Sequence, residues 1–241
     1  MSKVAFLFPG QGAQSVGMAR DLYEAYPEVR RWMDAAAEAA GIELTRFCFE
    51  GPEAELTRTS NAQPAILAAS VAALIGIYRG LGVWQLLPVE EWFTGGGAPA
   101  ALPHVAAGLS LGEYTALVCA GAVSPLAAVG LVRKRGLFME EAGAAVGGTM
   151  ASVIGLARDK VEAACREAGG VVVCANYNAP GQIVISGETA AVERAGALAR
   201  EKGARLVKVL SVSGAFHSPL MRPAAERLAG ELSAVCIQDA R

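Results

Sequence analysis

Apolar and polar residues alternate along the chain in blocks that predict a mixture of strands and helices. Residues 3–8, KVAFLF, form a short apolar run that a Pro-Gly pair ends, as is typical of a buried strand. Helical patterns follow to about residue 85, and residues 104–109, HVAAGL, predict a second short strand. The apolar stretch 64–78 is too short and too rich in alanine to span a bilayer, so we expect a buried helix there.

A different rhythm runs from about residue 149 to residue 212. Its pattern predicts, in order, a strand, a helix, two strands, a helix and a strand, with MASVIGL as the first strand and RLVKVLSV as the last. This β-α-β-β-α-β order is that of a ferredoxin-like domain. We therefore predict an α/β fold in which a small ferredoxin-like subdomain, 146–212, is inserted into a large subdomain made of 1–145 and 213–241.

The segment 86–105 separates the helical patterns of the first half from the second predicted strand. It carries three prolines and a triple glycine, which predict a loop or an insertion.

Composition narrows the class of protein. The 241 residues are 53% hydrophobic and 18% charged, which predicts a globular chain with a sizeable core. The formal net charge of −2 gives no broad attraction to nucleic acid or to an anionic membrane. The first residues, MSKVAFLFPGQG, do not have the pattern of a signal peptide, and the five cysteines are scattered and never spaced C-x-x-C. We expect a cytoplasmic protein with reduced thiols and no metal site.

The first candidate for chemistry is Ser110, in the stretch GLSLGEYTAL at 108–117. A Gly-x-Ser-x-Gly motif between a strand and a helix is the signature of a nucleophile elbow, a sharp turn that exposes the serine hydroxyl. Two interpretations remain open from the motif itself. Ser110 is either a nucleophile or a small residue in a tight turn.

A nucleophilic serine needs a general base, which is most often histidine, and the chain has two histidines. His104 stands six residues before Ser110, about 20 Å away along an extended strand, so we expect a loop histidine there. His217, in SGAFHSPLM, follows the last predicted strand of the small subdomain. If Ser110 is a nucleophile, His217 is its base by elimination; the alternative is a packing histidine.

An anion that develops on an attacked carbonyl needs N–H donors in place. One candidate is the backbone N–H of Leu111, directly after the serine and at a helix N-terminus. The other is Gln11, which lies between Gly10 and Gly12 after the first strand, in a segment that could also be a plain turn. A dinucleotide-binding fingerprint fails here because Ser15 stands where the third glycine would be.

Arg135 is the remaining unusual residue. It lies four residues after Leu131 and four before Met139, on the same apolar helical stripe, where an arginine is costly unless it meets an anion. Either a structural salt bridge or a bidentate clamp for a substrate carboxylate would supply that anion. Arg133 and Lys134 point elsewhere and are expected on a solvated face.

Six motifs together carry a family resemblance. They are, in order, FPGQGAQ (8–14), NAQPAI (61–66), GLSLGEY (108–114), VRKRGLFM (132–139), NYNAPGQIVISG (176–187) and GAFHSPLM (214–221). The set resembles the malonyl-CoA:acyl carrier protein transacylases of fatty acid synthesis and the related acyltransferase domains of polyketide synthases. The resemblance covers nearly the whole chain and implies an α/β-hydrolase-like large subdomain with a ferredoxin-like insert.

The resemblance also implies a role for each candidate residue. Ser110 would be the acylated nucleophile and His217 its base, Gln11 and Leu111 would form the oxyanion hole, and Arg135 would grip the malonyl carboxylate. The remaining implied positions line the substrate site: Gln63, Asn176, Asn178 and Phe216. Phe216 would select malonyl, because a smaller residue would make room for an α-methyl branch.

The substrates implied by the resemblance are malonyl-CoA and the phosphopantetheine thiol of acyl carrier protein. No cofactor or metal is implied, and no nucleic acid or membrane partner. The rival interpretations are a serine hydrolase or thioesterase that uses the same elbow, and a truncated paralogue with weak or no activity.

Two departures from the family pattern bear on those rivals. Leu109 stands where many members carry histidine, and members continue for several dozen residues beyond position 241 with a segment that orients the catalytic histidine.

Overall fold

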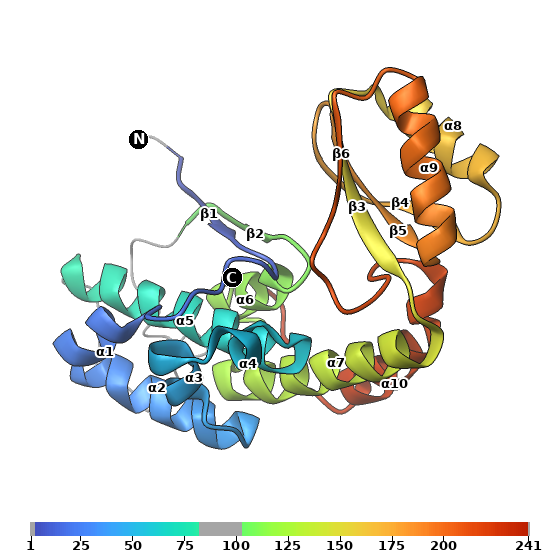
Figure 1. The fold of residues 1–241 in the computed structure, drawn as a ribbon. Coiled ribbons are helices and arrows are strands. Elements are labelled where there is room, and N and C mark those ends of the chain that lie inside the picture. The colour runs from blue at the N-terminus through green and yellow to red at the C-terminus, as the bar shows by residue number, and fades with distance from the viewer. Residues whose placement is uncertain (1–2, 82–102, 241) are drawn as a thin grey trace. The chain divides into compact units, whose positions relative to one another are not determined.

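The computed structural model describes residues 3–81 and 103–240. The chain forms two compact units, one of residues 1–136 with 230–241 and the other of residues 137–229 (Figure 1). Both units combine helices with strands, so the protein is of the α/β class, as predicted. Most of the predicted loop at 86–105 lies outside the described residues.

The first unit is mainly helical. Its elements before the second strand are β1 (Ala5–Phe8), α1 (Arg20–Ala25), α2 (Pro27–Ala40), α3 (Leu44–Glu50), α4 (Glu53–Thr57) and α5 (Thr59–Gly80). After β2 (Val105–Gly108) come α6 (Gly112–Cys119) and the first part of α7 (Pro125–Val146). The core gathers around α5, where the fully buried Trp32 of α2 donates its indole N–H to the Ala68 carbonyl at 2.8 Å.

Helix α5 contains the apolar stretch at 64–78 but extends beyond it at both ends. The helix has 22 residues, and an 18-residue window within it has a mean hydropathy of 1.4. By length and composition it could cross a membrane. However, 72% of that window is buried inside the protein, as in the core helix of a globular unit. The prediction of a buried helix is confirmed, and the helix is longer than the apolar stretch that the sequence marks.

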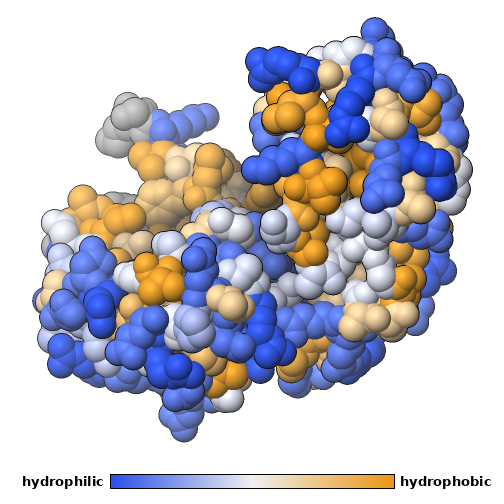
Figure 2. All heavy atoms as spheres, in the orientation of Figure 1, coloured by the Kyte–Doolittle hydropathy of each residue, from blue (hydrophilic) through white to orange (hydrophobic). Residues whose placement is uncertain are grey.

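The sheet of the first unit consists of β1 and β2, which pair in parallel with Phe8 opposite Gly108. Parallel sheets are usually covered on both faces. Here Leu7 is 78% exposed and Val105 is 57% exposed, and Figure 2 shows apolar atoms gathered over these two strands. This sheet therefore exposes large apolar side chains.

The second unit holds a four-stranded antiparallel sheet in the order β4-β5-β3-β6. Its elements are β3 (Thr149–Ile154), α8 (Arg158–Ala168), β4 (Val172–Ala179), β5 (Gln182–Gly187), α9 (Thr189–Glu201) and β6 (Leu206–Val209). The predicted order of strands and helices between 149 and 212 is confirmed. The chain continues through a loop into the short 3-10 helix η2 (Pro219–Met221) and α10 (Arg222–Ser233).

Alternation along the strands gives this sheet two apolar faces. Val153, Ile183 and Ile185 pack against α8 and α9 on one face. Met150 and Val184, from the alternate positions, pack with a second cluster that contains Met139, Phe216 and Met221. Because side chains of a strand alternate between faces, each sheet residue belongs to one cluster only.

Strand β4 departs from strict alternation. Cys174 lies opposite Ile185, whereas Asn176 lies opposite Val184, so Ala175 is the extra residue of a β-bulge. Residues directly opposite in an antiparallel pair share a face. Cys174 therefore faces α8, and Asn176 faces the cluster of Phe216.

The predicted subdomain boundaries and the boundaries of the compact units differ. The compact units meet at 136/137 and 229/230, in the middle of α7 and near the end of α10. The predicted boundaries, 145/146 and 212/213, follow the inserted elements instead, and they stay a prediction.

Candidate active site

The turn that carries Ser110 depends on the two glycines of its motif. A Cβ on Gly108 would lie 1.9 Å from the backbone of Gly112, and a Cβ on Gly112 would lie 2.2 Å from the Phe8 carbonyl oxygen. Real side chains do not tolerate such distances. The glycines are present because β2, α6 and the end of β1 approach one another at backbone contact.

Ser110 itself has a left-handed backbone conformation, with φ of 52°. For a residue other than glycine this conformation costs on the order of 1 kcal/mol or more and is concentrated at functional sites. Helix α6 follows directly, with Leu111 as its N-cap. The N–H groups of Gly112 and Glu113 donate back to the carbonyls of Leu109 and Ser110, at 2.8 and 3.3 Å, and these bonds hold the turn against the start of the helix.

The PGQG segment after β1 lies beside this turn. Parallel β1 and β2 end at the same edge of their sheet, and a Cβ on Gly10 would lie 2.7 Å from the Leu109 carbonyl oxygen. The Gln11 side chain donates from Nε2 to the Thr59 hydroxyl at 3.1 Å, which ties it to the start of α5. Fixing the side chain in this way fixes the backbone of residue 11 next to the elbow.

Arg135, on α7, joins the elbow to α5. It donates from Nη1 to Oε1 of Gln63 at 2.6 Å and from Nη2 to Oγ of Ser110 at 3.1 Å. Gln63 is fully buried, and Arg135 is only 9% exposed. A long cation is therefore held with two neighbouring N–H donors directed at the serine and at a buried amide.

The groups in direct contact with the Arg135 guanidinium are neutral. Its guanidinium lies 5.5 Å from the centre of the Tyr114 ring, within the range of a cation–π contact. Burial lowers the pKa of Arg135, and Tyr114 and Glu113 partly oppose that effect. Within residues 3–81 and 103–240 the guanidinium forms no ion pair with a carboxylate, so the salt-bridge interpretation has no support there.

In the second unit, His217 occupies an exposed loop position with a left-handed φ of 59°. The residue after it fixes the loop. The Ser218 hydroxyl donates to the Ala215 carbonyl at 2.6 Å and accepts from the Leu220 N–H at 3.3 Å, which caps η2. The loop thus presents the imidazole outward while its neighbours are buried.

Phe216 and Asn176 belong to the same face of the second sheet. Phe216 is 5% exposed in the cluster with Met139 and Met221. The bulge at Ala175 directs Asn176 to that face, opposite Val184. Two of the three residues that the resemblance assigns to substrate binding in this unit are therefore on one side of its sheet.

The predicted residues thus fall into two groups. Ser110, Arg135 and Gln63 are joined by hydrogen bonds in the first unit, with Leu111 and Gln11 beside them. His217, Phe216 and Asn176 are in the second unit, and the pairing of Ser110 with His217 stays a prediction.

The other histidine is tied to the opposite end of β2 from the serine. His104 accepts a hydrogen bond from the Val4 N–H at 3.2 Å, as expected of a structural loop histidine.

Sequence reasoning missed three residues that position this chemistry. Tyr114 lies under Arg135, Thr59 holds Gln11, and Ser218 caps the His217 loop. Only Ser218 had a readable signal, because a serine followed by proline is a common start of a helix. Arg133 was expected on a solvated face, which is wrong, since it is half-buried and donates to Asn61 at 3.0 Å.

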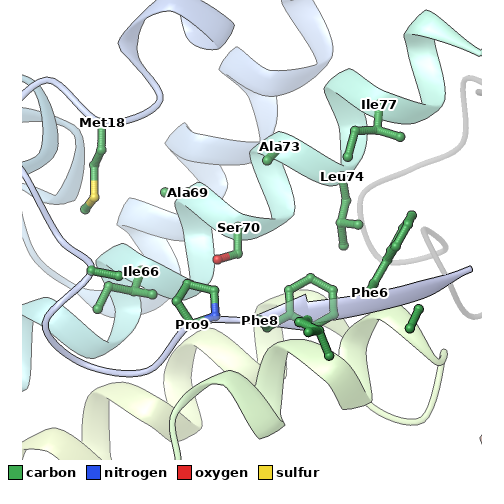
Figure 3. A pocket seen from close by; sticks show the side chains of 13 residues that line it. Phe6, Phe8, Pro9, Met18, Ile66, Ala69, Ser70, Ala73, Leu74 and Ile77 are labelled. Carbon is green, nitrogen blue, oxygen red and sulfur yellow. The ribbon is translucent and has the colours of Figure 1, made fainter. Parts of the chain in front are cut away.

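A pocket of about 450 Å³ opens between β1 and α5 in the first unit (Figure 3). Its walls include Phe6, Phe8, Leu74 and Ile77, and Ser70 contributes a hydroxyl. It contains no charged residue and neither Ser110 nor Arg135. Its lining does not suit a carboxylate or a thioester donor, so we do not assign the chemistry to it.

Metal chemistry has no obvious place among these groups. The described parts of the chain contain no cluster of three or more His, Cys, Asp or Glu side chains that could hold a metal ion. The groups that could act on a substrate are a hydroxyl, an imidazole, backbone N–H donors and a guanidinium.

Comparison with known proteins identifies the family of this chain. The acyl transferase domain family matches residues 5–241. The chain is 48% identical over 243 residues to the malonyl CoA-acyl carrier protein transacylase of Bacillus subtilis (strain 168), covering all of this chain and 71% of that protein.

Solved structures give the same result. An acyl carrier protein S-malonyltransferase from Vibrio cholerae has a TM-score of 0.86 at 42% identity, over 99% of this chain and 73% of that one. A malonyl-transacylase in complex with its type II PKS acyl-carrier protein has a TM-score of 0.87 at 39% identity, over 99% and 72% of the two chains. The chain therefore belongs to the acyl transferase domain family and, within it, to the malonyl CoA-acyl carrier protein transacylases.

Proposed function

We propose that this chain transfers a malonyl group from malonyl-CoA to the phosphopantetheine thiol of acyl carrier protein, through a malonyl ester on Ser110. The names of its relatives support this substrate pair. The observation that carries the proposal is the hydrogen bond between the buried guanidinium of Arg135 and the hydroxyl of Ser110.

Arg135 supplies the preference for a dicarboxylic acyl unit. A guanidinium has five N–H donors in a planar fork and matches a carboxylate bidentately. In this protein the fork contacts an amide oxygen, a hydroxyl and an aromatic ring, all of which are neutral. A buried cation with neutral partners gains strongly from an anion, and the free carboxylate of malonyl provides one.

In the first half of the reaction, His217 accepts the Ser110 proton while Oγ attacks the malonyl thioester carbonyl. The resulting oxyanion accepts hydrogen bonds from the backbone N–H groups of Leu111 and Gln11. The C–S bond then breaks, the malonyl ester remains on Ser110, and His217 gives its proton to the CoA thiolate.

The second half reverses these steps with a different thiol. His217 accepts the proton of the phosphopantetheine thiol, whose sulfur attacks the malonyl-serine ester. Collapse of the second oxyanion breaks the C–O bond, and His217 returns the proton to Ser110. Gln63 holds Arg135 in place throughout, while Asn176 and Phe216 contact the acyl unit and Phe216 excludes an α-methyl branch. This ping-pong cycle uses no cofactor.

The proposal also covers the two subdomains, the pathway and the cellular location. Residues 1–145 and 213–241 form an α/β-hydrolase-like subdomain, supported by the parallel β1–β2 pair that leads into the elbow. Residues 146–212 form a ferredoxin-like subdomain, supported by the order β4-β5-β3-β6. The reaction serves fatty acid synthesis in the cytoplasm, a setting that the five free thiols support.

The test is incubation with malonyl-CoA labelled in the malonyl group. A labelled protein that persists in buffer and discharges on addition of holo acyl carrier protein supports a transferase. Rapid discharge to water would instead indicate a thioesterase, and no labelling of a folded sample would indicate an inactive paralogue.

A second measurement addresses the clamp. We expect Arg135→Ala to lower the preference for malonyl over acetyl by about 10- to 100-fold, the value of a charge-assisted hydrogen bond. Lys134→Ala is the matched control, because Lys134 is an exposed neighbour paired with Glu231 at 2.6 Å. Equal selectivity in the two variants would overturn the role of Arg135.

A further inference from the structure

Two cysteines of the second unit lie side by side although the sequence separates them by nine positions. Sγ of Cys165, on α8, is 4.0 Å from Sγ of Cys174, on β4. Cys165 is buried in the cluster between the sheet and the helices, and Cys174 is half-buried at the edge of that cluster. Its pairing with Ile185 places Cys174 on the face that α8 covers.

The two thiols have different surroundings. The neighbouring Cys165 thiol lowers the pKa of Cys174, and Tyr177 and Arg158 nearby act in the same direction. Burial opposes that shift, as does the carboxylate of Glu162. The hydrogen bond to Cys174 and burial raise the pKa of Cys165, so it keeps its proton.

A set of polar side chains surrounds the exposed side of this pair. Arg158 donates to Glu162 at 2.7 Å and lies 4.5 Å from the centre of the Tyr177 ring. Tyr177 donates its hydroxyl to Glu162 at 3.0 Å. On the neighbouring strand β5, the residues opposite Cys174 and Tyr177 are Ile185 and Ile183, which carry no charge. A small polar oxidant can therefore reach Cys174 from the surface, while Cys165 lies beneath.

We infer that Cys165 and Cys174 form a redox-sensitive dithiol, in which a hydroperoxide oxidises Cys174 and Cys165 then closes an intramolecular disulfide. This inference concerns the second unit alone and does not depend on the proposed transfer reaction. Reactive cysteines are distinguished by thiolate character and access, and both favour Cys174 as the residue that reacts first.

The chemistry balances in two steps. The Cys174 thiolate attacks one oxygen of the peroxide, the O–O bond breaks, hydroxide or alkoxide leaves, and Cys174 becomes a sulfenic acid while the peroxide is reduced. Sγ of Cys165 then attacks Sγ of Cys174, the S–O bond breaks, and the sulfenic hydroxyl leaves as water with the Cys165 proton.

Closure needs only a short movement. A disulfide bond is about 2.05 Å long, so the sulfur atoms must approach by about 2 Å. Helix α8 ends at Ala168 and β4 begins at Val172, and the link between them contains Gly169 and Gly170, both with positive φ. The segment that joins the two cysteines is thus a short glycine turn, and Arg194 donates to its Ala168 and Gly169 carbonyls at 2.7 and 3.1 Å.

The test uses hydrogen peroxide on the reduced whole chain, followed by removal of the peroxide and denaturation. We expect the mass to fall by about 2 Da, two of the five thiols to be lost, and peptide mapping to join Cys165 to Cys174. A dithiol reductant should restore both thiols. The initial rate should rise with pH as the Cys174 thiolate forms.

Three variants separate the two roles. Cys165→Ser should stop at a sulfenic acid on Cys174 that a dimedone probe captures, and Cys174→Ser should slow thiol loss at least about tenfold. Cys236→Ser, which removes the exposed cysteine near the chain end, should change neither result. Retention of all five thiols, or a disulfide between other cysteines, would overturn the inference.

Discussion

The two units build their parts of the candidate site in opposite ways. In the first unit, Ser110 lies in a turn compressed by backbone contacts, and its hydroxyl is bonded to a buried arginine. In the second unit, His217 is exposed, and a serine cap together with the burial of Phe216 fixes its loop. The comparison teaches that backbone packing and one buried hydrogen bond hold the serine turn, whereas a few local hydrogen bonds hold the loop of the histidine.

The largest expected effect tests whether the two units share one reaction. We expect Ser110→Ala and His217→Ala each to lower malonyl transfer by about 10⁴-fold, since each removes one member of a nucleophile–base pair. Because the two residues act together, the double variant should be no slower than the worse single variant. The measurement is the transfer rate for all four proteins, with circular dichroism as the check on folding.

A multiplied loss in the double variant would contradict the pairing of the two residues. Ser70→Ala is the matched control, because Ser70 borders the apolar pocket of the same unit and not the elbow. It should keep the rate within about twofold, as expected of a surface change away from the chemistry.

The second largest effect concerns the backbone packing of the turn that carries Ser110. Gly112→Ala places a methyl group 2.2 Å from the Phe8 carbonyl oxygen, so we expect a loss of about 3 kcal/mol or more in the free energy of unfolding. Gly130→Ala is the control within the same unit, on α7, where the added methyl would lie 4.0 Å from the Ala39 carbonyl oxygen, an ordinary contact distance. Urea denaturation should separate the two variants clearly.

Gly130→Ala should be neutral or slightly stabilising, because alanine is the better helix former by up to about 1 kcal/mol. Equal stability of the two variants would show that the elbow can expand, and the packing explanation of its glycines would be lost.

The smallest effect concerns the loop that carries His217. Ser218→Ala removes the cap of η2, which costs about 1 kcal/mol of stability, and it frees the loop that carries His217. We therefore expect a modest loss of transfer rate, about tenfold, without a change in malonyl preference. Ser211→Ala, an exposed position earlier in the same connection, should change neither quantity.

Much of the fold follows from sequence pattern. The strands and helices between 149 and 212 are predictable because their apolar periods of two and 3.6 residues are regular and glycines separate them. The elbow is predictable because only glycine fits at 108 and 112. Arg135 is recognisable because a cation on an apolar stripe requires a partner.

The remaining features depend on tertiary contacts that leave no local mark. Tyr114 orients Arg135 only because α6 and α7 lie close enough for their side chains to meet, and a tyrosine one turn after the serine does not reveal this. Arg133 is expected in solvent because it lies off the apolar stripe of α7 that carries Arg135. In the structure, however, Arg133 joins α7 to α5 through its hydrogen bond to Asn61. The bulge in β4 has no glycine at its extra residue, and strict alternation would assign Asn176 to the wrong face.

That bulge also makes β4 tolerant of the deletion of one residue. Loss of a single residue from a strand normally turns every side chain on one side of the deletion over to the other side. Ala175 is surplus to the pairing with β5, so a chain without it would keep Cys174 opposite Ile185 and Asn176 opposite Val184. At this position, a deletion would be milder than the insertion of one more residue.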